Sequence, residues 1–362
     1  MVYSLKCLSK DKLITFFKIQ ARIRLIELYL AKKYPEQQMK CPMHLCLGQE
    51  SVAAACGVIS DRQDIFMGNY RSHGHYLAKG GNLFRLFAEL LGRQEGCSGG
   101  MGGSMHLIDL ECMFYGTSAI VGATIPISTG IALGAAYNQR KQVVFVFFGD
   151  GAMEEGVIYE SILFAKLHRL SIIFVCENNQ LAIDTPLSLR TPSSVLHNRF
   201  RSLNIHSHYI DTLKIKNITY LLKKTLEAYH FVKRTSQPCL LEFKVSRWAS
   251  HVGPQFEGPV HAWWQNPWSK EATNCTLVKT VRYLLHKNIL TLPDIKMFYA
   301  DEQKKIETTF KQALKNTTPP AFKQIKHLVY ASGLESALPF KKNILHHIPN
   351  QKTNDSYSTN PF

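Results

Sequence analysis

The sequence predicts an α/β protein whose doubly wound, mostly parallel sheet carries helices on both faces. Two apolar runs, 143–148 and 171–175, consist mainly of β-branched and aromatic residues, a composition typical of strands buried on both faces of a parallel sheet. Between them, residues 152–169 place apolar side chains at helical spacing. The three segments form a βαβ unit, the building block of doubly wound sheets.

The remaining elements follow from the same patterns. The segment 12–32 has an apolar stripe at helical spacing, and 126–137 is expected to be a Gly- and Ala-rich helix that another backbone can approach closely. A glycine-rich loop is expected at 92–103 and a second loop at 184–201. Further helices are expected at 51–58, 82–91, 218–233 and 277–315, and further strands at 208–210 and 239–245.

Length and composition set the domain organisation. The 362 residues have room for one large α/β domain or two smaller ones. We expect an N-terminal extension at 1–11, one domain at 12–333 and a polar C-terminal tail at 334–362. A hydrophobic content of 45% is ample for a core. No apolar run approaches the ~20 residues needed to cross a bilayer, so no membrane partner is expected.

Cysteine usage and charge narrow the class of protein. Nine scattered cysteines without a Cys-x-x-Cys pair favour a reducing compartment over a disulfide scaffold or a zinc site. The net charge of +16 would permit nucleic-acid binding, but the basic residues are dispersed and no nucleic-acid motif accompanies them. We expect a solvated basic surface, with an acidic protein partner as the alternative. The N-terminal residues lack a signal-peptide core, which favours a bacterial cytoplasm.

Asp150 and Asn179 each follow one of the two apolar strands of the βαβ unit. Ligands of open α/β sheets bind at the carboxyl ends of the strands, so both side chains are expected at the ligand-binding edge. A carboxylate and an amide oxygen suit Mg²⁺, which in turn bridges to substrate phosphates. The alternative is two ordinary strand-ending turns, in which Gly supplies unusual dihedrals and Asp an Asx-type hydrogen bond.

The spacing of these residues also matches a known motif. Gly-Asp-Gly at 149–151 followed by Asn-Asn at 178–179 resembles the diphosphate-binding motif of thiamine-diphosphate enzymes. Three further motifs stand upstream in the expected order, at 70–74 (Tyr-Arg-Ser-His-Gly), 96–106 (glycine-rich) and 120–123 (Ile-Val-Gly-Ala). Together they make the chain similar, from about 15 to 333, to the alpha subunit of the heteromeric 2-oxo acid dehydrogenase decarboxylating component, of the pyruvate and acetoin dehydrogenase type.

The resemblance implies a thiamine diphosphate site with Mg²⁺. In that family the metal would be held by Asp150, Asn179 and the main-chain carbonyl of Leu181, where Tyr is common. The residues that match cofactor contacts are Tyr70, Arg71, Val121, Gly149, Gly151, Ala152, Asn179, Arg247 and His251. Arginine gives the diphosphate bidentate, charge-assisted hydrogen bonds. The alternative for the two arginines is an ordinary surface ion pair.

Two histidines match catalytic positions of the family. The His73 equivalent contacts the 2-oxo acid, and the His251 equivalent guides acyl transfer to a lipoyl group. A side chain that titrates near neutrality suits such proton transfers; a merely hydrogen-bonded structural histidine is the alternative for each. His106 either approaches the site or only packs, and Glu154 and Glu155 are interpreted as first-turn acids of a helix.

The activity implied is that of an oxidoreductase that decarboxylates a small 2-oxo acid, pyruvate first, or cleaves acetoin, and passes the product to a lipoyl carrier. The pyrimidine-binding domain of such enzymes would lie on a separate beta subunit, and we expect two alpha and two beta chains. A lipoyl acyltransferase is the expected partner. The alternatives are transfer to a non-lipoyl acceptor such as a sugar, and a non-catalytic binding paralogue.

Overall fold

The computed structural model, which describes residues 8–256, 274–315 and 317–320, is built on a six-stranded sheet in the order β2-β1-β3-β4-β8-β7. Every pairing between neighbouring strands of this sheet is parallel. The strands are β1 (Ile65–Met67), β2 (Phe114–Gly116), β3 (Val144–Gly149), β4 (Ile172–Asn178), β7 (His206–Asp211) and β8 (Cys239–Lys244). The predicted parallel sheet is confirmed, and β3 and β4 are its central strands.

Helices cover both faces of the sheet, as predicted for a doubly wound fold. Side chains of β3 alternate between two apolar cores, because successive residues of a strand point to opposite faces. Phe145 and Phe147 join the core that contains α1 (Lys10–Lys33), α2 (Glu50–Ile59) and α8 (Thr219–Thr235). The alternate residues of the strand join the second core, with α5 (Thr124–Tyr137), α6 (Gly156–Leu167) and α7 (Asn198–Arg201).

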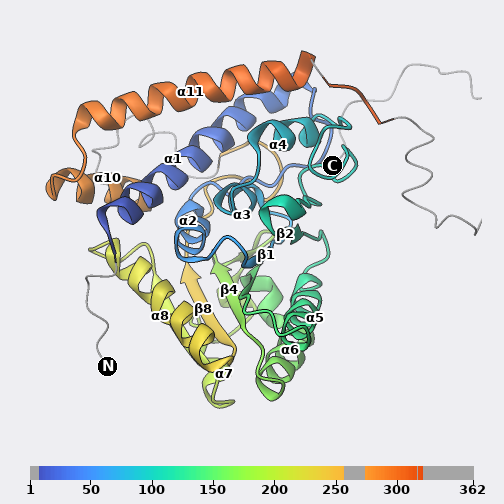
Figure 1. Ribbon diagram of the computed structural model, residues 1–362, viewed down its shortest axis with the longest axis vertical. Helices are drawn as coiled ribbons and strands as arrows, with labels where there is room; N and C mark the ends of the chain where they lie inside the picture. The colour runs from blue at the N-terminus through green and yellow to red at the C-terminus, as the bar shows by residue number, and fades with distance from the viewer. Residues whose placement is uncertain (1–7, 257–273, 316, 321–362) are drawn as a thin grey trace, which may run out of the picture. The chain divides into compact units, whose positions relative to one another are not determined.

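The remaining elements complete the first face and the connections. The helices are α3 (His73–Ala78), α4 (Leu83–Leu90), α10 (Thr276–His286) and α11 (Leu292–Lys315). Short 3₁₀ turns are η2 (Tyr34–Glu36), η3 (Leu110–Cys112), η4 (Asp150–Glu154) and η5 (Leu187–Leu189). A small antiparallel hairpin joins β5 (Leu181–Ala182) to β6 (Thr185–Pro186). Long α1 and α11 run beside each other in Figure 1, and they contact each other.

The structure differs from the sequence-based elements in several places, among them α3 and β5, which were not expected. The helix expected from 152 begins only at Gly156, because Glu155 is extended (ψ 134°) and the residues before it form η4. The expected helix 277–315 is two helices, α10 and α11. Strands β1 and β2 have three residues each, too short for a periodic pattern to show. The expected loop 184–201 contains β6, η5 and α7.

The described residues up to Pro319 belong to one compact unit, and the second unit is Pro320–Phe362. Most of the N-terminal extension and all of the predicted polar tail at 334–362 lie outside the described residues. No helix in the described part of the chain is long and apolar enough to cross a membrane. The eight described cysteines are all free.

The glycine-rich loop that follows α4 is folded around one buried carboxylate. Glu89 Oε2 accepts hydrogen bonds from the amides of Ser98 (2.7 Å) and Gly100 (2.9 Å). Its Oε1 accepts from the amides of Gly102 (2.7 Å) and Gly103 (3.0 Å). Gly100 and Gly103 have φ of +77° and +58°, so the loop needs glycine to present these amides. Glu89 therefore fixes the backbone that leads to Ser104.

We predict that Glu89→Gln destabilises the protein by about 3 kcal/mol, because an amide keeps one acceptor oxygen and turns a donor toward buried N–H groups. Urea unfolding would measure the change. The control is Glu160→Gln, the same substitution at an exposed position of α6, where we expect a change within about 0.5 kcal/mol. Equal stability of the two variants would contradict this role of Glu89.

Candidate functional site

The carboxyl ends of β3 and β4 meet at one edge of the sheet, and the two residues singled out by the sequence follow these ends. Gly149 of β3 pairs with Glu177 of β4, so Asp150 and Asn179 come just after neighbouring strand ends. The turn η4 also packs on the hairpin that follows Asn179: a Cβ added to Gly151 would lie 3.2 Å from Cβ of Ala182. The two turns are therefore adjacent, as expected from the βαβ unit.

Asp150 is a buried carboxylate with only one of its oxygens engaged. The residue is 1% exposed. Oδ2 is paired with Nη2 of Arg190, whereas Oδ1 is buried without a hydrogen-bond partner. Burial raises the pKa of Asp150 above its usual range, against the opposing effect of Arg190. A buried oxygen without a partner is costly, and a cation at this position would satisfy it. The residues present thus fit a magnesium site.

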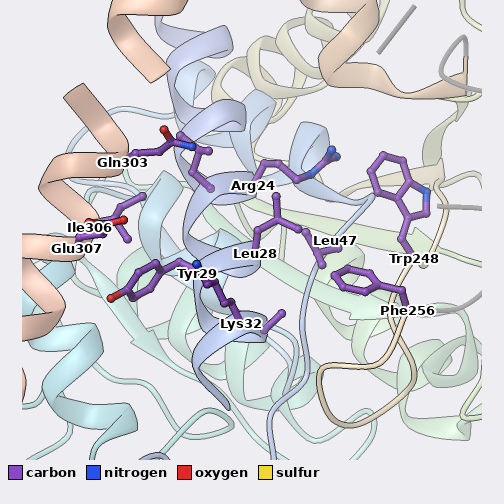
Figure 2. Close-up of a pocket in the computed structure, with 12 residues that line it drawn as sticks. Arg24, Leu28, Tyr29, Lys32, Leu47, Trp248, Phe256, Gln303, Ile306 and Glu307 are labelled. Carbon is purple, nitrogen blue, oxygen red and sulfur yellow. The ribbon is translucent and has the colours of Figure 1, made fainter. Parts of the chain in front are cut away.

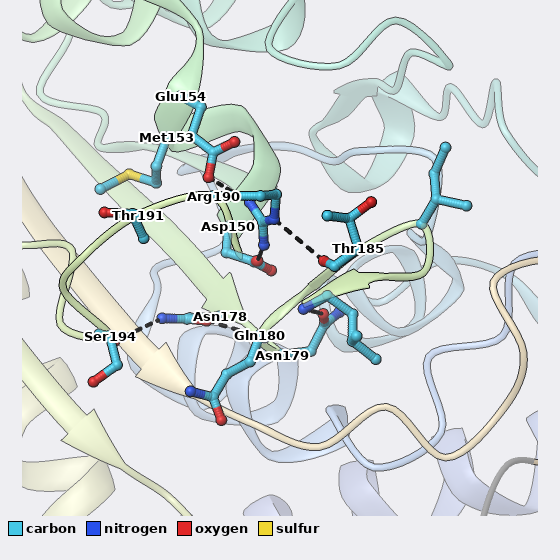
Figure 3. A network of polar contacts seen from close by, with 12 residues as sticks. Asp150, Met153, Glu154, Asn178, Asn179, Gln180, Thr185, Arg190, Thr191 and Ser194 are labelled. Carbon is cyan, nitrogen blue, oxygen red and sulfur yellow. Dashed lines mark hydrogen bonds and ion pairs between the residues drawn. The ribbon is translucent and has the colours of Figure 1, made fainter. Parts of the chain in front are cut away.

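Arg190, which the sequence analysis did not select, brings three oxygen acceptors together (Figure 3). Besides Asp150, its guanidinium contacts Oε1 of Glu154 at 2.5 Å and the carbonyl of Thr185 at 3.2 Å. The Arg190 side chain is only 10% exposed. Glu154, interpreted from the sequence as a first-turn acid of a helix, instead lies in η4 and holds this arginine. An arginine in a polar loop carries no sequence signal for such a role.

Asn178 and Asn179 have different roles. Asn178 is fully buried, and its amide nitrogen donates to Oε1 of Glu242 at 2.7 Å, which is a structural contact. Asn179 is half-buried, and its Oδ1 accepts from the amide of Leu181 at 3.0 Å. Asn178 Oδ1 likewise accepts from Gln180, which has a φ of +67°. Two successive Asx turns therefore fix the start of the hairpin and the backbone that carries the Leu181 carbonyl.

His73 lies in a buried chain of side chains rather than at an open surface. Its Nδ1 is 2.7 Å from Oε1 of Glu27, and its Nε2 is 2.8 Å from Oγ of Ser104. Glu27 Oε2 also accepts from the amide of Cys46 at 2.6 Å. Both ring nitrogens are thus engaged, and contact with a substrate would require Ser104 to release the ring. The catalytic role of His73 stays a prediction.

Tyr70, Arg71 and His251 come together around His44, which was not among the predicted site residues. The His44 ring lies 4.8 Å from the ring of Tyr70 and 5.0 Å from that of His251, measured between centroids. Arg71 is buried and donates to the carbonyls of Leu45 (2.5 Å) and His251 (3.2 Å). Burial, followed by the positive charge of Arg71, lowers the pKa of His44 to about 3, so this ring is neutral at physiological pH.

The other predicted cofactor residues are arranged around the same strand ends. Arg247, just after β8, donates to the carbonyl of Ile183 and to Oδ1 of Asp184, both in the turn of the hairpin. Val121 is 47% exposed in the loop before α5, where the neighbouring Gly122 packs on Glu155. Gly149 ends β3, and Ala152 is buried in η4.

His106, for which the sequence left two readings, is exposed, and its carbonyl accepts from Ser98 Oγ at 2.7 Å. The hydrogen bond described for His106 is thus made by its main chain. It does not distinguish a side chain that approaches the site from one that only packs.

A pocket of about 480 Å³ has none of these residues in its lining (Figure 2). It is lined by residues of α1 and α11, together with Leu47, Trp248 and Phe256. Arg24 stacks on the Trp248 ring at 4.2 Å and binds Glu50 with two hydrogen bonds, which closes one wall. No predicted cofactor residue lines this pocket, so we do not place the cofactor there. Within the described ranges, no group of three or more His, Cys, Asp or Glu side chains could hold a metal.

The family model described as dehydrogenase E1 component matches residues 19–321. The pyruvate dehydrogenase E1 component subunit alpha of Rickettsia typhi is 32% identical over 298 residues, which cover 82% of this chain and 90% of the relative. The protein of the same name from Rickettsia prowazekii is 32% identical over 287 residues, 79% of this chain and 86% of the relative.

A plant protein with a corresponding name is also similar to this chain. The mitochondrial pyruvate dehydrogenase E1 component subunit alpha-1 of Arabidopsis thaliana is 34% identical over 246 residues, 67% of this chain and 61% of the relative. The family match spans most of the chain and includes every residue of the site described above. The chain therefore belongs to the dehydrogenase E1 component family.

Proposed function

We propose that this chain is the alpha subunit of a heteromeric thiamine-diphosphate enzyme that decarboxylates pyruvate and passes the acyl group to a lipoyl carrier. The observation that carries the proposal is the buried, half-satisfied carboxylate of Asp150 beside Asn179 at the carboxyl edge of a parallel sheet. Relatives named pyruvate dehydrogenase E1 component subunit alpha support pyruvate as the substrate. The enzyme would be an oxidoreductase.

The cofactor would be held by the residues at the strand ends. Asp150, the amide oxygen of Asn179 and the carbonyl of Leu181 would bind Mg²⁺, all oxygen ligands of the kind this ion prefers. Arg71, Tyr70 and Arg247 would meet the diphosphate, with the main chain of Gly149, Gly151 and Ala152 close to it, and Val121 would support the rings. Thiamine diphosphate, when bound, supplies the carbanion chemistry that 2-oxo acid decarboxylation needs.

The chain itself orients its two catalytic histidines. Glu27 accepts from Nδ1 of His73, and we therefore assign the Nε2 atom as the acceptor of the Ser104 hydroxyl. This arrangement holds the ring in one tautomer and aims Nε2 toward the glycine-rich loop. The main-chain carbonyl of His251 is held by Arg71, which places that ring beside the neutral His44. His251 is then available for proton transfer during acyl transfer.

The beta subunit would dock on the face formed by α5 and α6, which lie side by side in Figure 1. Large apolar side chains are exposed there, and exposed apolar groups on a helical face mark protein interfaces. The exposed residues on these helices and the loop before them are Ile120, Val121, Ile127, Leu133, Tyr137, Leu163, Phe164 and Leu167. Val121, a predicted cofactor residue, belongs to the same set, which fits a cofactor held between the subunits.

For the whole assembly we propose two alpha and two beta chains. We propose the cytoplasm of a bacterium as its location, which the free cysteines favour.

Turnover by the purified alpha–beta complex tests the proposal. Pyruvate, 2-oxobutyrate and acetoin would be supplied separately with Mg²⁺, thiamine diphosphate and an artificial electron acceptor. We expect cofactor-dependent turnover that is fastest with pyruvate. An absence of turnover with all three substrates would contradict the proposed function, and a preference for acetoin would reassign the substrate.

Asp150→Ala is predicted to lower the affinity of the complex for thiamine diphosphate in the presence of Mg²⁺ by more than about a hundredfold. Losing a partner that only orients a metal ligand already costs roughly 10- to 100-fold, and here a ligand itself is lost. Calorimetric titration measures the affinity. Asp301→Ala, at an exposed aspartate of α11, is the control and should bind as the wild type does. Retained affinity in Asp150→Ala would remove the metal assignment.

His251→Ala is predicted to impair acyl transfer to a lipoyl domain by about a hundredfold, the usual scale of acid–base catalysis, while turnover with an artificial acceptor falls much less. The two rates would be measured on the same preparation. His286→Ala, an exposed histidine of α10, should change neither rate. Equal losses in both assays would contradict the transfer role.

Aspartate at the α5–α6 face is predicted to weaken assembly with the beta subunit, because a charge would be buried in the interface without a partner. Ile127→Asp and Leu167→Asp change residues that are 52% and 78% exposed, so the fold of the chain should be retained. Sedimentation velocity would report a shift from complex to free chains. Leu292→Asp, on α11, is the control. Unchanged assembly in both α5–α6 variants would place the beta subunit elsewhere.

A further inference from the structure

The guanidinium of Arg190 lies where a cation is needed. Its three contacts are the carboxylates of Asp150 and Glu154 and the carbonyl of Thr185, contributed by η4 and β6. We propose that Arg190 is the counter-ion of Asp150 in the metal-free protein and that Mg²⁺ displaces it, so that Arg190 competes with the metal. This inference rests on the proposed function, because it takes Asp150 as a magnesium ligand.

Burial explains why the metal-free protein needs such a counter-ion. Asp150 is 1% exposed and Oδ1 has no partner, so without Arg190 the carboxylate would be buried with no compensating charge. The arginine contact engages Oδ2 only. The free Oδ1 gives an arriving metal ion a first ligand before the arginine has left.

Charge explains why the two cations would not share Asp150. A guanidinium and a divalent ion on the two oxygens of one carboxylate would lie within a few ångströms of each other and repel strongly, because the site is shielded from water. A second carboxylate also lies within contact distance of Arg190. Glu154, whose side chain is 32% exposed, is already paired with the other terminal nitrogen of Arg190. To leave Asp150, the Arg190 side chain therefore only has to rotate while it keeps its contact with Glu154.

The alternative is that Arg190 stays in place and orients Asp150 for the metal, as hydrogen-bonded partners of metal ligands often do. The two readings predict opposite effects of removing the arginine. If Arg190 competes, its removal strengthens metal binding, since the ion no longer has to break a pair. If Arg190 orients the ligand, its removal weakens metal binding.

The experiment uses the full chain assembled with its beta subunit, without thiamine diphosphate, so that contacts of Arg190 with a diphosphate cannot contribute. Mn²⁺ prefers the same oxygen ligands as Mg²⁺, and its free-ion electron paramagnetic resonance signal reports binding. Arg190→Gln removes the charge, and Arg190→Lys keeps it without the forked geometry. Arg199→Gln is the matched control, because Arg199 lies near the same turn and donates to the carbonyl of Met153 and to Thr191 Oγ1.

We expect a roughly tenfold lower dissociation constant for Mn²⁺ in Arg190→Gln, because the metal no longer has to break one charge-assisted pair. Arg190→Lys should lie between this variant and the wild type, and Arg199→Gln should match the wild type. In chelator, Arg190→Gln should also unfold at a lower temperature than the wild type, and saturating Mg²⁺ should remove most of the difference. Protection by Mg²⁺ gives a second readout that does not depend on activity.

Weaker or unchanged Mn²⁺ binding in Arg190→Gln, with normal binding in the wild type, would overturn the displacement and leave the proposed function standing. An equal gain in Arg199→Gln would also overturn it, because the effect would then be one of net charge. A wild-type complex that binds neither Mn²⁺ nor Mg²⁺ at this site would overturn the metal assignment of the proposed function, and the displacement with it.

Discussion

The carboxylate of Asp150, buried where β3 ends, imposes the requirement on which the rest of the site depends. A buried charge is costly unless an opposite charge or several hydrogen bonds accompany it. Only one oxygen of Asp150 has a partner. The chain that follows β4 meets this requirement: the Asx turns of Asn178 and Asn179 start a hairpin, and the hairpin leads Arg190 back over the strand end. The same turns present oxygen atoms that suit a metal ion.

Three other buried carboxylates organise the surroundings by the same principle, each with a different kind of partner. Glu89 takes four backbone amides of the glycine-rich loop, Glu27 takes the ring of His73 and an amide, and Glu50 takes the guanidinium of Arg24. Glu27 and Glu50 thereby join segments far apart in the sequence, whereas Glu89 holds the loop that follows its own helix. Because buried polar groups must be satisfied, these contacts fix the loops around the site more tightly than apolar packing alone would.

The sequence predicts the central unit of this fold well and its polar network poorly. Strands β3 and β4 have long, unbroken apolar runs, so their burial and parallel pairing could be inferred, and with them the positions of Asp150 and Asn179. The three-residue β1 and β2 carry too little pattern to be detected. Glu89 and Arg190 could not be found, because their partners are backbone groups or turns that come together only in three dimensions. The polar face of α1, at Gln20, Arg24 and Glu27, has helical spacing and could have indicated a buried network.

The most direct test of the account is a calorimetric titration of thiamine diphosphate, with Mg²⁺, into this chain alone and into the chain assembled with its beta subunit. We predict tight, Mg²⁺-dependent binding only in the assembly, because the diphosphate would be held by this chain and the remainder of the cofactor by the partner. Equally tight binding to the chain alone would contradict a cofactor site shared between subunits. No binding in either sample would contradict the assignment of Asp150 and Asn179 as the site that anchors the cofactor.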